Sequence, residues 1–481
     1  MLIPVILISA DWVLRVGLSL RIIMCRRGIG PSLGWISIIL LVPLFGSFAY
    51  LMVGETRLGR GRAARAVEIN ERNRARQEEI YTASPADFTD ASSVCELMHR
   101  HGWLSTGFGA LAGNELTLID DCERTLRTII EDVDRARHSC HMEFYIWSVG
   151  GTADEVAAAV IRAAGRGVQC RILVDAVGSG DFLESEQAGV MRQAGVEVVA
   201  ALPVGIIRAL FRRIDLRLHR KIVVIDGEIA YMGSLNLADA RHFKRDAGVG
   251  EWVDAMVRIT GPAAEALALI FLQDWELETE EPVEQLEQSA DLHHVQSRGG
   301  VTAQVVPSGP GASPRTIHDM LVSTIYAARE RLVITSPYFA PDEAMLAALT
   351  TAAMRGVQVT LVLPERIDSP LVRYASRSHY QPLLEAGVRI MLYRSGLLHA
   401  KTITVDDEIS CIGSVNMDMR SFWLNFEVTL FVYHDGFNDE LRYMQARYIS
   451  ESDPVELNTW SRRRLWQRVV ENTLRLVSPM L

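Results

Sequence analysis

The stretch His219-Arg-Lys-Ile-Val-Val-Ile-Asp226, followed by Gly233-Ser-Leu-Asn236, has a second copy later in the chain. That copy reads His399-Ala-Lys-Thr-Ile-Thr-Val-Asp406 and then Gly413-Ser-Val-Asn416, with every shared residue displaced by 180 positions. Both copies fit the pattern H-x-K-x(4)-D-x(6)-G-S-x-N. A single H-x-K-x(4)-D run is weak evidence in a chain of 481 residues. Two copies with matched downstream segments are highly specific, and they predict a duplicated unit.

A wider repeat surrounds the two motifs. Residues 166–174 read RGVQCRILV, and residues 355–363 read RGVQVTLVL. Each run follows an Ala-rich amphipathic stretch, at residues 154–164 and 342–354. An amphipathic helix, a glycine stop and a buried strand in that order are typical of alternating α/β architecture. The predicted fold class is therefore α/β, with two homologous halves packed with pseudo-two-fold symmetry and preceded by N-terminal transmembrane helices.

Two apolar stretches begin the chain. Residues 33–53 form a run of 21 residues without a charge. At a rise of 1.5 Å per residue, a helix of this length spans a hydrocarbon core of about 30 Å, so we expect a transmembrane helix here. Residues 2–24 are also apolar, but three charged residues interrupt them: Asp11, Arg15 and Arg21. This stretch either spans the bilayer with its charged groups paired to the second helix or lies partly in the interface.

The charge of the chain is uneven. There are 49 basic and 59 acidic residues, which gives a formal net charge of −10, yet residues 1–80 contain 11 arginines and only 6 acids. A basic front on an acidic body indicates anionic membrane lipids as partners, and nucleic acid is not expected, because a nucleic-acid-binding domain would be broadly basic. The arginines after residue 56 place the body in the cytoplasm, whereas Arg26 and Arg27 argue partly for the opposite orientation.

These patterns give a domain organisation. We expect a membrane anchor at 1–56, an Arg/Glu-rich linker at 57–106, and two halves at 107–285 and 286–481. The acidic segment Glu278–Asp291 is expected to connect the halves.

The six cysteines do not indicate a metal centre. None of them forms a C-x-x-C pair, and the histidines near Cys95 and Cys140 do not match a usual zinc spacing. We therefore expect reduced structural thiols, no bound metal and no cofactor. The sequence carries no signal for an oligomeric state.

The two motifs suit phosphodiester chemistry. β-Branched runs place both on strands, where a period of two puts His219 and Lys221 on one face, and likewise His399 and Lys401. Packing of the halves about a pseudo-two-fold axis would bring all four side chains to one site. The lysines would neutralise phosphoryl oxygens, one histidine would attack phosphorus, and the other would protonate the leaving alkoxide. The lysine charges make a metal ion unnecessary for this chemistry.

Further polar residues are assigned supporting roles. Four side chains are expected to donate hydrogen bonds to phosphate oxygens: Ser234, Asn236, Ser414 and Asn416. Two carboxylates are expected to orient the imidazoles, namely Asp254, which lies 35 residues after His219, and Glu427, which lies 28 residues after His399. Asp226 and Asp406 are displaced from their lysines by an odd number of positions, so on a straight strand they face away and are interpreted as structural acids.

The duplicated H-x-K-x(4)-D resembles the defining signature of the phospholipase D superfamily. Within it, the chain is most similar to the bacterial cardiolipin synthases. The similarity covers nearly the whole chain: two apolar N-terminal stretches, the segment GETRLG at 54–59, both motifs, and Ser-Pro near the C terminus. The resemblance implies an active site formed by six residues: His219, Lys221, Asp226, His399, Lys401 and Asp406.

The resemblance also implies an activity. Two phosphatidylglycerol molecules would become cardiolipin and glycerol through a phosphohistidine intermediate, at the bacterial cell membrane and in a multi-pass protein. A phospholipase D hydrolase or another phosphatidyltransferase would carry the same residues. A nuclease of the superfamily is disfavoured by the anchor and the acidic body, and an inactive membrane scaffold is disfavoured by the two intact motifs.

Two basic amphipathic segments complete the analysis. The first half has 12 more residues than the second between its Ala-Gly-Val segment and its histidine, and this insertion alternates apolar residues with arginines over 206–217. We expect it to touch the membrane at the mouth of the site, the alternative being a solvated basic helix. The C-terminal stretch 462–477 either lies on the bilayer or caps the core of the second half, and the packing role is favoured.

Overall fold

The computed structural model describes residues 2–25, 29–54, 60–89, 91–203, 215–243, 247–286, 292–311 and 314–477. The chain forms two compact units, Met1–Ala63 with Val204–Leu216 (unit 1) and Ala64–Pro203 with Arg217–Leu481 (unit 2). Most of the insertion expected to touch the membrane (residues 204–214) lies outside the described residues, as do residues 55–59, 287–291 and 478–481.

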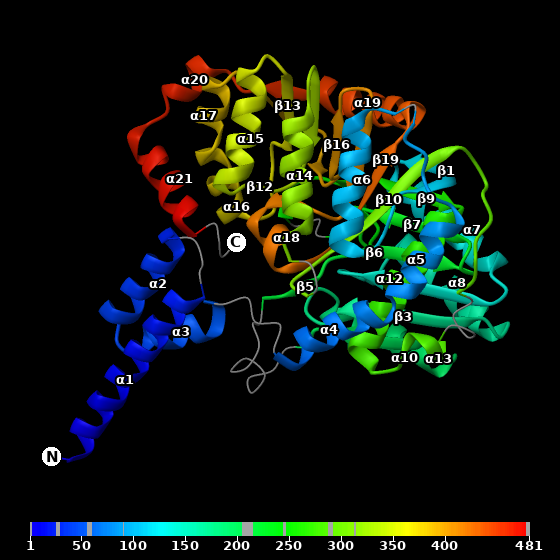
Figure 1. The fold of residues 1–481 in the computed structure, drawn as a ribbon, viewed down its shortest axis with the longest axis horizontal. Coiled ribbons are helices and arrows are strands. Elements are labelled where there is room, and N and C mark those ends of the chain that lie inside the picture. Colours follow the sequence, from blue (N-terminus) through cyan, green and yellow to red (C-terminus); the bar gives the residue numbers. More distant parts are fainter. Residues whose placement is uncertain are drawn as a thin grey trace. The chain divides into compact units, whose positions relative to one another are not determined.

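The N-terminal part of unit 1 forms three consecutive helices, α1 (Leu2–Met24), α2 (Ile29–Leu41) and α3 (Phe45–Val53) (Figure 1). The expectation of one continuous helix over residues 33–53 is wrong, because the helix is interrupted between α2 and α3. Pro43 has no amide N–H with which to continue a helix, and Leu44 adopts a φ of 58°, outside the right-handed helical region. The apolar stretch is therefore a bent pair of shorter helices.

The interior of unit 1 is small and partly polar. Its buried apolar residues come from all three helices: Leu18, Ile22, Ile39 and Tyr50. Arg15 forms an ion pair with Asp11 within α1 and donates a hydrogen bond to the carbonyl of Leu40 in α2 at 3.1 Å. Within the described ranges, no helix combines the length and apolar character that crossing a bilayer requires.

Unit 2 is built on one long mixed sheet. The strands of its first half are β1 (Leu111–Ile119), β2 (Ser139–Phe144), β3 (Gln169–Asp175), β4 (Glu197–Ala201), β5 (Arg217–Leu218), β6 (Lys221–Ile225), β7 (Ile229–Gly233), β8 (Trp252–Val253) and β9 (Met256–Thr260). Those of its second half are β10 (Val301–Ser308), β11 (Arg331–Thr335), β12 (Phe339–Ala340), β13 (Gln358–Pro364), β14 (Arg389–Tyr393), β15 (Leu397–Leu398), β16 (Thr402–Val405), β17 (Ile409–Gly413), β18 (Met417–Asp418), β19 (Asn425–Tyr433) and β20 (Ser452–Pro454).

The strand order shows the duplication directly. It runs β20-β14-β13-β11-β16-β17-β19-β10-β1-β9-β7-β6-β2-β3-β4, and the halves meet where β1 pairs antiparallel with β10. Read outward from that junction, each half has a first strand, then three antiparallel strands, then three strands paired in parallel, and the second half ends with one further antiparallel strand, β20. The prediction of two homologous α/β halves is confirmed.

Helices cover the sheet (Figure 1). In the first half they are α7 (Cys122–Arg135), α8 (Thr152–Gly165), α9 (Gly180–Leu183), α10 (Glu186–Gln193), α12 (Pro262–Thr279) and α13 (Val283–Leu286). In the second half they are α14 (Thr316–Ala327), α15 (Glu343–Met354), α16 (Pro370–Ser378), α17 (Tyr380–Glu385), α18 (Met419–Trp423), α19 (Asp435–Ser450), α20 (Leu457–Ser461) and α21 (Leu465–Val477). Each half buries its own apolar core, which holds the strands rigidly in place.

The segment expected to be a linker is structured. It forms α4 (Arg60–Arg72), α5 (Arg74–Ala83) and α6 (Ser93–Thr106). Cys95 and Met98 of α6 are buried in the apolar core of the second half. In addition, Arg76 of α5 forms an ion pair with Glu265 of α12 at 3.1 Å. From Ala64 onward these residues therefore belong to the body.

The glycine that opens each Gly-Ser-x-Asn segment is required by a close strand approach. A Cβ atom on Gly233 would lie 2.3 Å from the carbonyl oxygen of Ala255, and one on Gly413 would lie 2.3 Å from that of Val428. No side chain fits at those distances. The two glycines thus let β7 approach β9 and let β17 approach β19, which brings the following serines beside Asp254 and Glu427.

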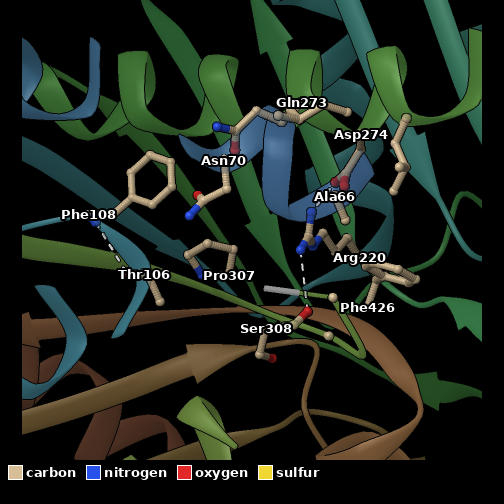
Figure 2. A pocket seen from close by; sticks show the side chains of 14 residues that line it. Ala66, Asn70, Thr106, Phe108, Arg220, Gln273, Asp274, Pro307, Ser308 and Phe426 are labelled. Carbon is tan, nitrogen blue, oxygen red and sulfur yellow. Dashed lines mark hydrogen bonds and ion pairs between the residues drawn. The ribbon is translucent and has the colours of Figure 1, made fainter. Parts of the chain in front are cut away.

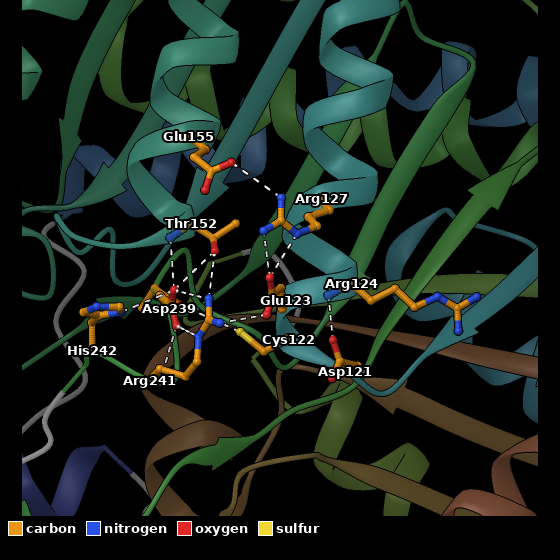
Figure 3. Close-up of polar contacts among 11 residues, drawn as sticks. Asp121, Cys122, Glu123, Arg124, Arg127, Thr152, Glu155, Asp239, Arg241 and His242 are labelled. Carbon is orange, nitrogen blue, oxygen red and sulfur yellow. Dashed lines mark hydrogen bonds and ion pairs between the residues drawn. The ribbon is translucent and has the colours of Figure 1, made fainter.

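An ion-pair chain fixes the loop that follows the first Gly-Ser-x-Asn segment (Figure 3). Asp239 accepts a hydrogen bond from the backbone N–H of Thr152 at 3.0 Å, at the start of α8, and pairs with Arg241 at 2.9 Å. Arg241 also pairs with Glu123 of α7 at 2.9 Å. Because Asp239 follows Asn236 by three residues, these ion pairs and the hydrogen bond to Thr152 hold the end of the motif against α7 and α8.

Candidate active site

Two short strands cross from one half to the other at the motifs. β5, directly before His219, pairs in parallel with β19 of the second half. β15, directly before His399, pairs in parallel with β8 of the first half. The backbone N–H of His219 donates to the carbonyl of Phe426 at 2.9 Å, and that of His399 donates to the carbonyl of Val253 at 2.7 Å. Each histidine is therefore anchored on the opposite half.

The histidine side chains are paired with carboxylates in the same crossed manner. Nδ1 of His219 lies 2.8 Å from Oε2 of Glu427, and Nδ1 of His399 lies 2.7 Å from Oδ1 of Asp254. The sequence spacing relates each carboxylate to the histidine of its own half. In the structure each carboxylate instead contacts the histidine of the other half. All four side chains are buried. With Nδ1 engaged, Nε2 is the nitrogen of each ring that can react.

The two serines hold the carboxylates. The Ser234 hydroxyl donates to Oδ1 of Asp254 at 2.6 Å, and the Ser414 hydroxyl donates to Oε2 of Glu427 at 2.5 Å. Since a hydroxyl has a single proton, neither serine can at the same time donate to a phosphate oxygen. This corrects the expectation that both serines bind phosphate directly.

The two asparagines lie beside the serines. Oδ1 of Asn236 accepts a hydrogen bond from the backbone N–H of Ile146 at 3.3 Å. Nδ2 of Asn416 donates to the Ser421 hydroxyl at 3.2 Å. Both asparagines are buried, and these hydrogen bonds tie the first motif to the segment after β2 and the second motif to α18.

Both lysine ammonium groups are buried at the same place. Nζ of Lys221 donates to the carbonyl of His219 at 2.5 Å, and Nζ of Lys401 donates to the carbonyl of His399 at 2.6 Å. Burial lowers the pKa of Lys221 to about 7 and that of Lys401 to about 8, against the opposing attraction of Glu427 and Asp254. The charge of Lys401 also lowers the pKa of Lys221, as expected for two cations that share one site.

The imidazoles are neutral near pH 7. Burial, together with the lysine charges, lowers the pKa of both His219 and His399 to about 4, while the paired carboxylates oppose the change. Burial alone would raise the pKa of Asp254, but His399 and Lys401 hold it at about 2. The site is thus two neutral imidazoles between fixed carboxylates and partly charged ammonium groups.

The two motif aspartates lie elsewhere. Asp226 accepts hydrogen bonds from three consecutive backbone N–H groups, at residues 137, 138 and 139, at 2.7 to 3.0 Å. Asp406 accepts from the corresponding residues 329, 330 and 331 at 2.8 to 3.0 Å. Both follow the ends of β6 and β16 that are remote from the histidines, in turns with φ of 50° and 49°. The resemblance implied that both aspartates belong to the active site, and the structure corrects this: they hold backbone turns away from the histidines.

Aromatic rings that the sequence did not single out enclose the histidines. The ring centroid of Tyr145 lies 5.0 Å from that of His219, and those of Trp252 and Tyr338 lie 4.4 and 6.4 Å from that of His399. The Tyr338 hydroxyl donates to Asp368 at 2.8 Å. The positions of two of these rings could have been found from the sequence repeat, because Tyr145 and Tyr338 each follow the first parallel strand of their half, β2 and β11.

Arg220 breaks the symmetry between the motifs, since its counterpart is Ala400. Its Nε donates to the carbonyl of Glu427 at 3.0 Å, its guanidinium forms an ion pair with Asp274 of α12, and it donates to the carbonyl of Ser308 at 3.3 Å. Figure 2 shows this arginine between α12 and the strand end at Ser308, at the wall of a cavity. Arg220 thereby fixes the backbone of the residue that orients His219.

Family models match most of the chain. A model described as "Cardiolipin synthase, PLD-like domain" matches residues 129–275 and 321–447, and a model described as "Phospholipase_D-nuclease N-terminal" matches residues 13–55. The first model thus covers both motifs, one in each matched segment.

Two relatives match over nearly their whole lengths. The cardiolipin synthase A of Serratia proteamaculans is 42% identical over 476 residues, which cover 99% of this chain and 98% of the relative. The cardiolipin synthase A of Erwinia tasmaniensis is 43% identical over 476 residues, with the same shares covered. Among solved structures, the phosphatidylserine synthase of Haemophilus influenzae Rd KW20 matches with a TM-score of 0.59 and 14% identity, covering 80% of this chain and 100% of that one. The last likeness concerns the fold alone.

Proposed function

This chain belongs to the cardiolipin synthases of the phospholipase D superfamily, and from that premise we propose how its two halves transfer a phosphatidyl group between two phosphatidylglycerol molecules. It is a phosphatidyltransferase, and its products are cardiolipin and glycerol. The observation that carries the mechanism is the crossed pairing of His219 with Glu427 and of His399 with Asp254. Neither half has an oriented imidazole without the other, so one site serves one reaction.

The first step forms a covalent intermediate. Nε2 of one histidine attacks the phosphorus of a phosphatidylglycerol molecule, a P–N bond forms, and the P–O bond to the terminal glycerol breaks. The opposite histidine donates a proton to the departing glycerol oxygen. Neutral imidazole is the nucleophilic form, which suits a pKa of about 4. The negative charge of the bound phosphodiester favours the imidazolium form of the other histidine, which lets it act as the acid.

The second step reverses these roles. The opposite histidine removes the proton from a hydroxyl of the second phosphatidylglycerol, whose oxygen attacks phosphorus and displaces Nε2. Cardiolipin is released, the nucleophilic imidazole is again neutral, and the opposite histidine again carries the proton that it donates in the next cycle. Water at this stage would give phosphatidic acid instead, so the aromatic rings around the histidines (Tyr145, Trp252 and Tyr338) serve to exclude it.

The remaining polar residues support these steps. Lys221 and Lys401 stabilise the negative charge on the phosphoryl oxygens, and Asn236 and Asn416 provide amide groups at the same place. Ser234 and Ser414 are positioning residues for the carboxylates. Asp226 and Asp406 act on the fold by tying β6 and β16 to the start of the neighbouring strands.

Membrane attachment is part of the proposal. The substrate is a membrane lipid, and α1 to α3 of unit 1 expose large apolar side chains, including Val13, Ile29, Leu41 and Phe45. We propose that unit 1 holds the enzyme at the bacterial cell membrane, with the body on the cytoplasmic side as the arginines after residue 56 indicate. Anionic lipids are then both substrate and surrounding surface.

Product analysis tests the proposal. The purified full-length chain is incubated with phosphatidylglycerol carrying a labelled phosphate, and the lipids are separated by chromatography. Cardiolipin with an equal amount of free glycerol is expected, whereas phosphatidic acid as the main product would indicate a hydrolase and contradict the transfer. Denaturing quench of His219→Ala and His399→Ala should leave label on one of the two proteins, the one that retains the nucleophile. Absence of label from both would contradict the covalent intermediate.

A further inference from the structure

Helix α21 presents its apolar side to solvent. Leu465, Trp466 and Val469 are 73%, 56% and 55% exposed, and they share one side of the helix. A surface helix of a soluble domain ordinarily turns such a stripe inward. Here the residue turned inward is Glu471, which is 2% exposed.

Polar contacts fix this orientation. Glu471 forms ion pairs with Arg463 at 2.7 Å and with Arg377 of α16 at 3.4 Å. The guanidinium groups of Arg463 and Arg377 also lie over the ring of Trp460, at 3.8 and 5.0 Å from its centroid. The packed side of α21 is thus a buried ion-pair cluster, and this cluster keeps the apolar stripe on the outside. The sequence favoured core packing for the stripe, and the structure corrects that expectation.

The charge around the stripe is strongly positive. Residues 462–477 contain five arginines and one acid, Glu471, in a chain with a formal net charge of −10. A hollow between α21 and the end of α16 is lined by Arg468 and Arg475 together with Ser378 and Gln381. Glu471 and Glu385 also line this hollow, but the former is neutralised by its two arginines. An apolar stripe flanked by arginines is complementary to the surface of an anionic bilayer.

The same surface is linked to the candidate active site through α16. α16 lies beside α21 (Figure 1) and begins at Pro370, two residues after Asp368. Asp368 accepts the hydrogen bond of the Tyr338 hydroxyl, and the Tyr338 ring lies in an edge-to-face arrangement with that of His399. α16 thus connects the surface of α21 to the wall of the site.

We propose that α21 is an interfacial helix that docks the catalytic body on anionic lipid. Leu465, Trp466, Val469 and Val470 enter the headgroup boundary, and Arg468 and Arg475 contact lipid phosphates. The occupant is a bilayer surface rich in phosphatidylglycerol, a choice that rests on the proposed function. This contact is separate from the attachment made by unit 1, because it orients the body instead of retaining the chain.

Hydrogen exchange tests the docking without using turnover. The full-length chain is reconstituted in phosphatidylglycerol vesicles and in phosphatidylcholine vesicles, and amide exchange is followed over 465–475. Exchange in the anionic vesicles should be slower by at least about fivefold, the factor that a single arginine supplies near an anionic surface. The variants Trp466→Ser with Val469→Ser, and Arg468→Glu with Arg475→Glu, should each abolish the difference. Met354→Ser on α15, which is 78% exposed, and Arg192→Glu on α10 are the matched controls and should retain it.

Several results would overturn the docking. Equal exchange in the two vesicle types would do so. Slow exchange in detergent that becomes slower as the protein concentration rises would also overturn it, because a second copy of the chain would then cover the stripe. Slow exchange in detergent at every protein concentration would do the same, because another part of the chain would then cover the stripe. Measurement of cardiolipin formation distinguishes a failure of the docking proposal from a failure of the proposed function. The stripe variants should lose activity on vesicles and retain it on short-chain monomeric phosphatidylglycerol, whereas absence of cardiolipin from the unaltered chain would contradict the function itself.

Discussion

Nδ1 of His219 in the first half lies 2.8 Å from the carboxylate of Glu427 in the second half. The reciprocal contact joins His399 to Asp254 at 2.7 Å. Glu427 is in β19, which also pairs with the strand that leads into His219, so the backbone and the side chain of that histidine depend on the same strand of the other half. Orientation of each imidazole is therefore a property of the assembled pair of halves.

The first prediction concerns this cross-half contact. Glu427→Gln should lower kcat by about 10²- to 10⁴-fold, the usual contribution of an oriented acid–base group. The carboxylate raises the pKa of His219 against burial, so its loss should lower that pKa further while leaving His399 nearly unchanged. Histidine-selective ¹⁵N NMR measures both rings. Glu440→Gln, on the exposed face of α19, is the matched control, and a change at His399 in place of His219 would contradict the crossed pairing.

The second prediction is a pH profile for kcat/KM. The histidine pKa is lowered to about 4, so the nucleophile is available above that pH and is lost as pH falls through it. The lysine pKa values are lowered to about 7 and about 8, so positive charge is present below those values and is lost as pH rises through them. The profile should be bell-shaped, with an acid limb near 4 and an alkaline limb between 7 and 8.

Arginine substitution checks the origin of the alkaline limb. Lys221→Arg should reduce activity, because a planar guanidinium does not reproduce the ammonium geometry, but it replaces the lysine with the lower pKa by a group that stays charged at every accessible pH. The remaining activity should fall off at higher pH than in the unaltered enzyme. A profile that is flat from pH 6 to 9 in the unaltered enzyme would be incompatible with lysine control.

The third prediction separates structure from catalysis. Asp226→Asn keeps the size of the side chain and tolerates the positive φ, but it removes the charge that accepts three backbone N–H groups. The free energy of unfolding should fall by about 2 kcal/mol, as for hydrogen bonds to a charged group. Thermal unfolding measures this, with Asp439→Asn on the surface of α19 as control. A large loss of kcat without loss of stability would show that Asp226 acts in the reaction.

The fourth prediction concerns the asymmetry at Arg220. Arg220→Met leaves Asp274 buried without its cation, so the free energy of unfolding should fall by about 3–5 kcal/mol. Asp274→Asn combined with Arg220→Met should recover much of the loss. Ala400→Met at the corresponding position of the second motif is the comparison variant. An equal effect of the single and the double variant would argue against the buried ion pair as the cause.

Much of this architecture is predictable from the sequence. The repeat spacing indicates the duplicated α/β halves, and the period of a strand places His219 and Lys221 on one face. The outward displacement of Asp226 and Asp406 also follows from that period. Such features are local, because they depend only on residues within one strand and on the similarity of two segments.

Other features depend on how the halves meet, which no local pattern contains. The crossed carboxylates and the engagement of Ser234 and Ser414 follow from the pairing of β5 with β19 and of β15 with β8. The interruption near Pro43 is predictable from the sequence, since proline cannot donate within a helix, even though the run around it carries no charge. The outward orientation of the apolar stripe of α21 depends on the ion pairs of Glu471 with Arg463 and Arg377, which no local pattern contains.

The rate of cardiolipin formation by single-histidine variants tests the shared site most directly. It is measured for the purified unaltered chain, His219→Ala, His399→Ala and the double variant, with folding checked by thermal unfolding. Because each step needs a nucleophile or leaving group and an opposing acid or base, each single variant should lose at least about 10⁴-fold, and the double variant should be little worse. Substantial cardiolipin formation by either single variant would contradict one site built from both halves.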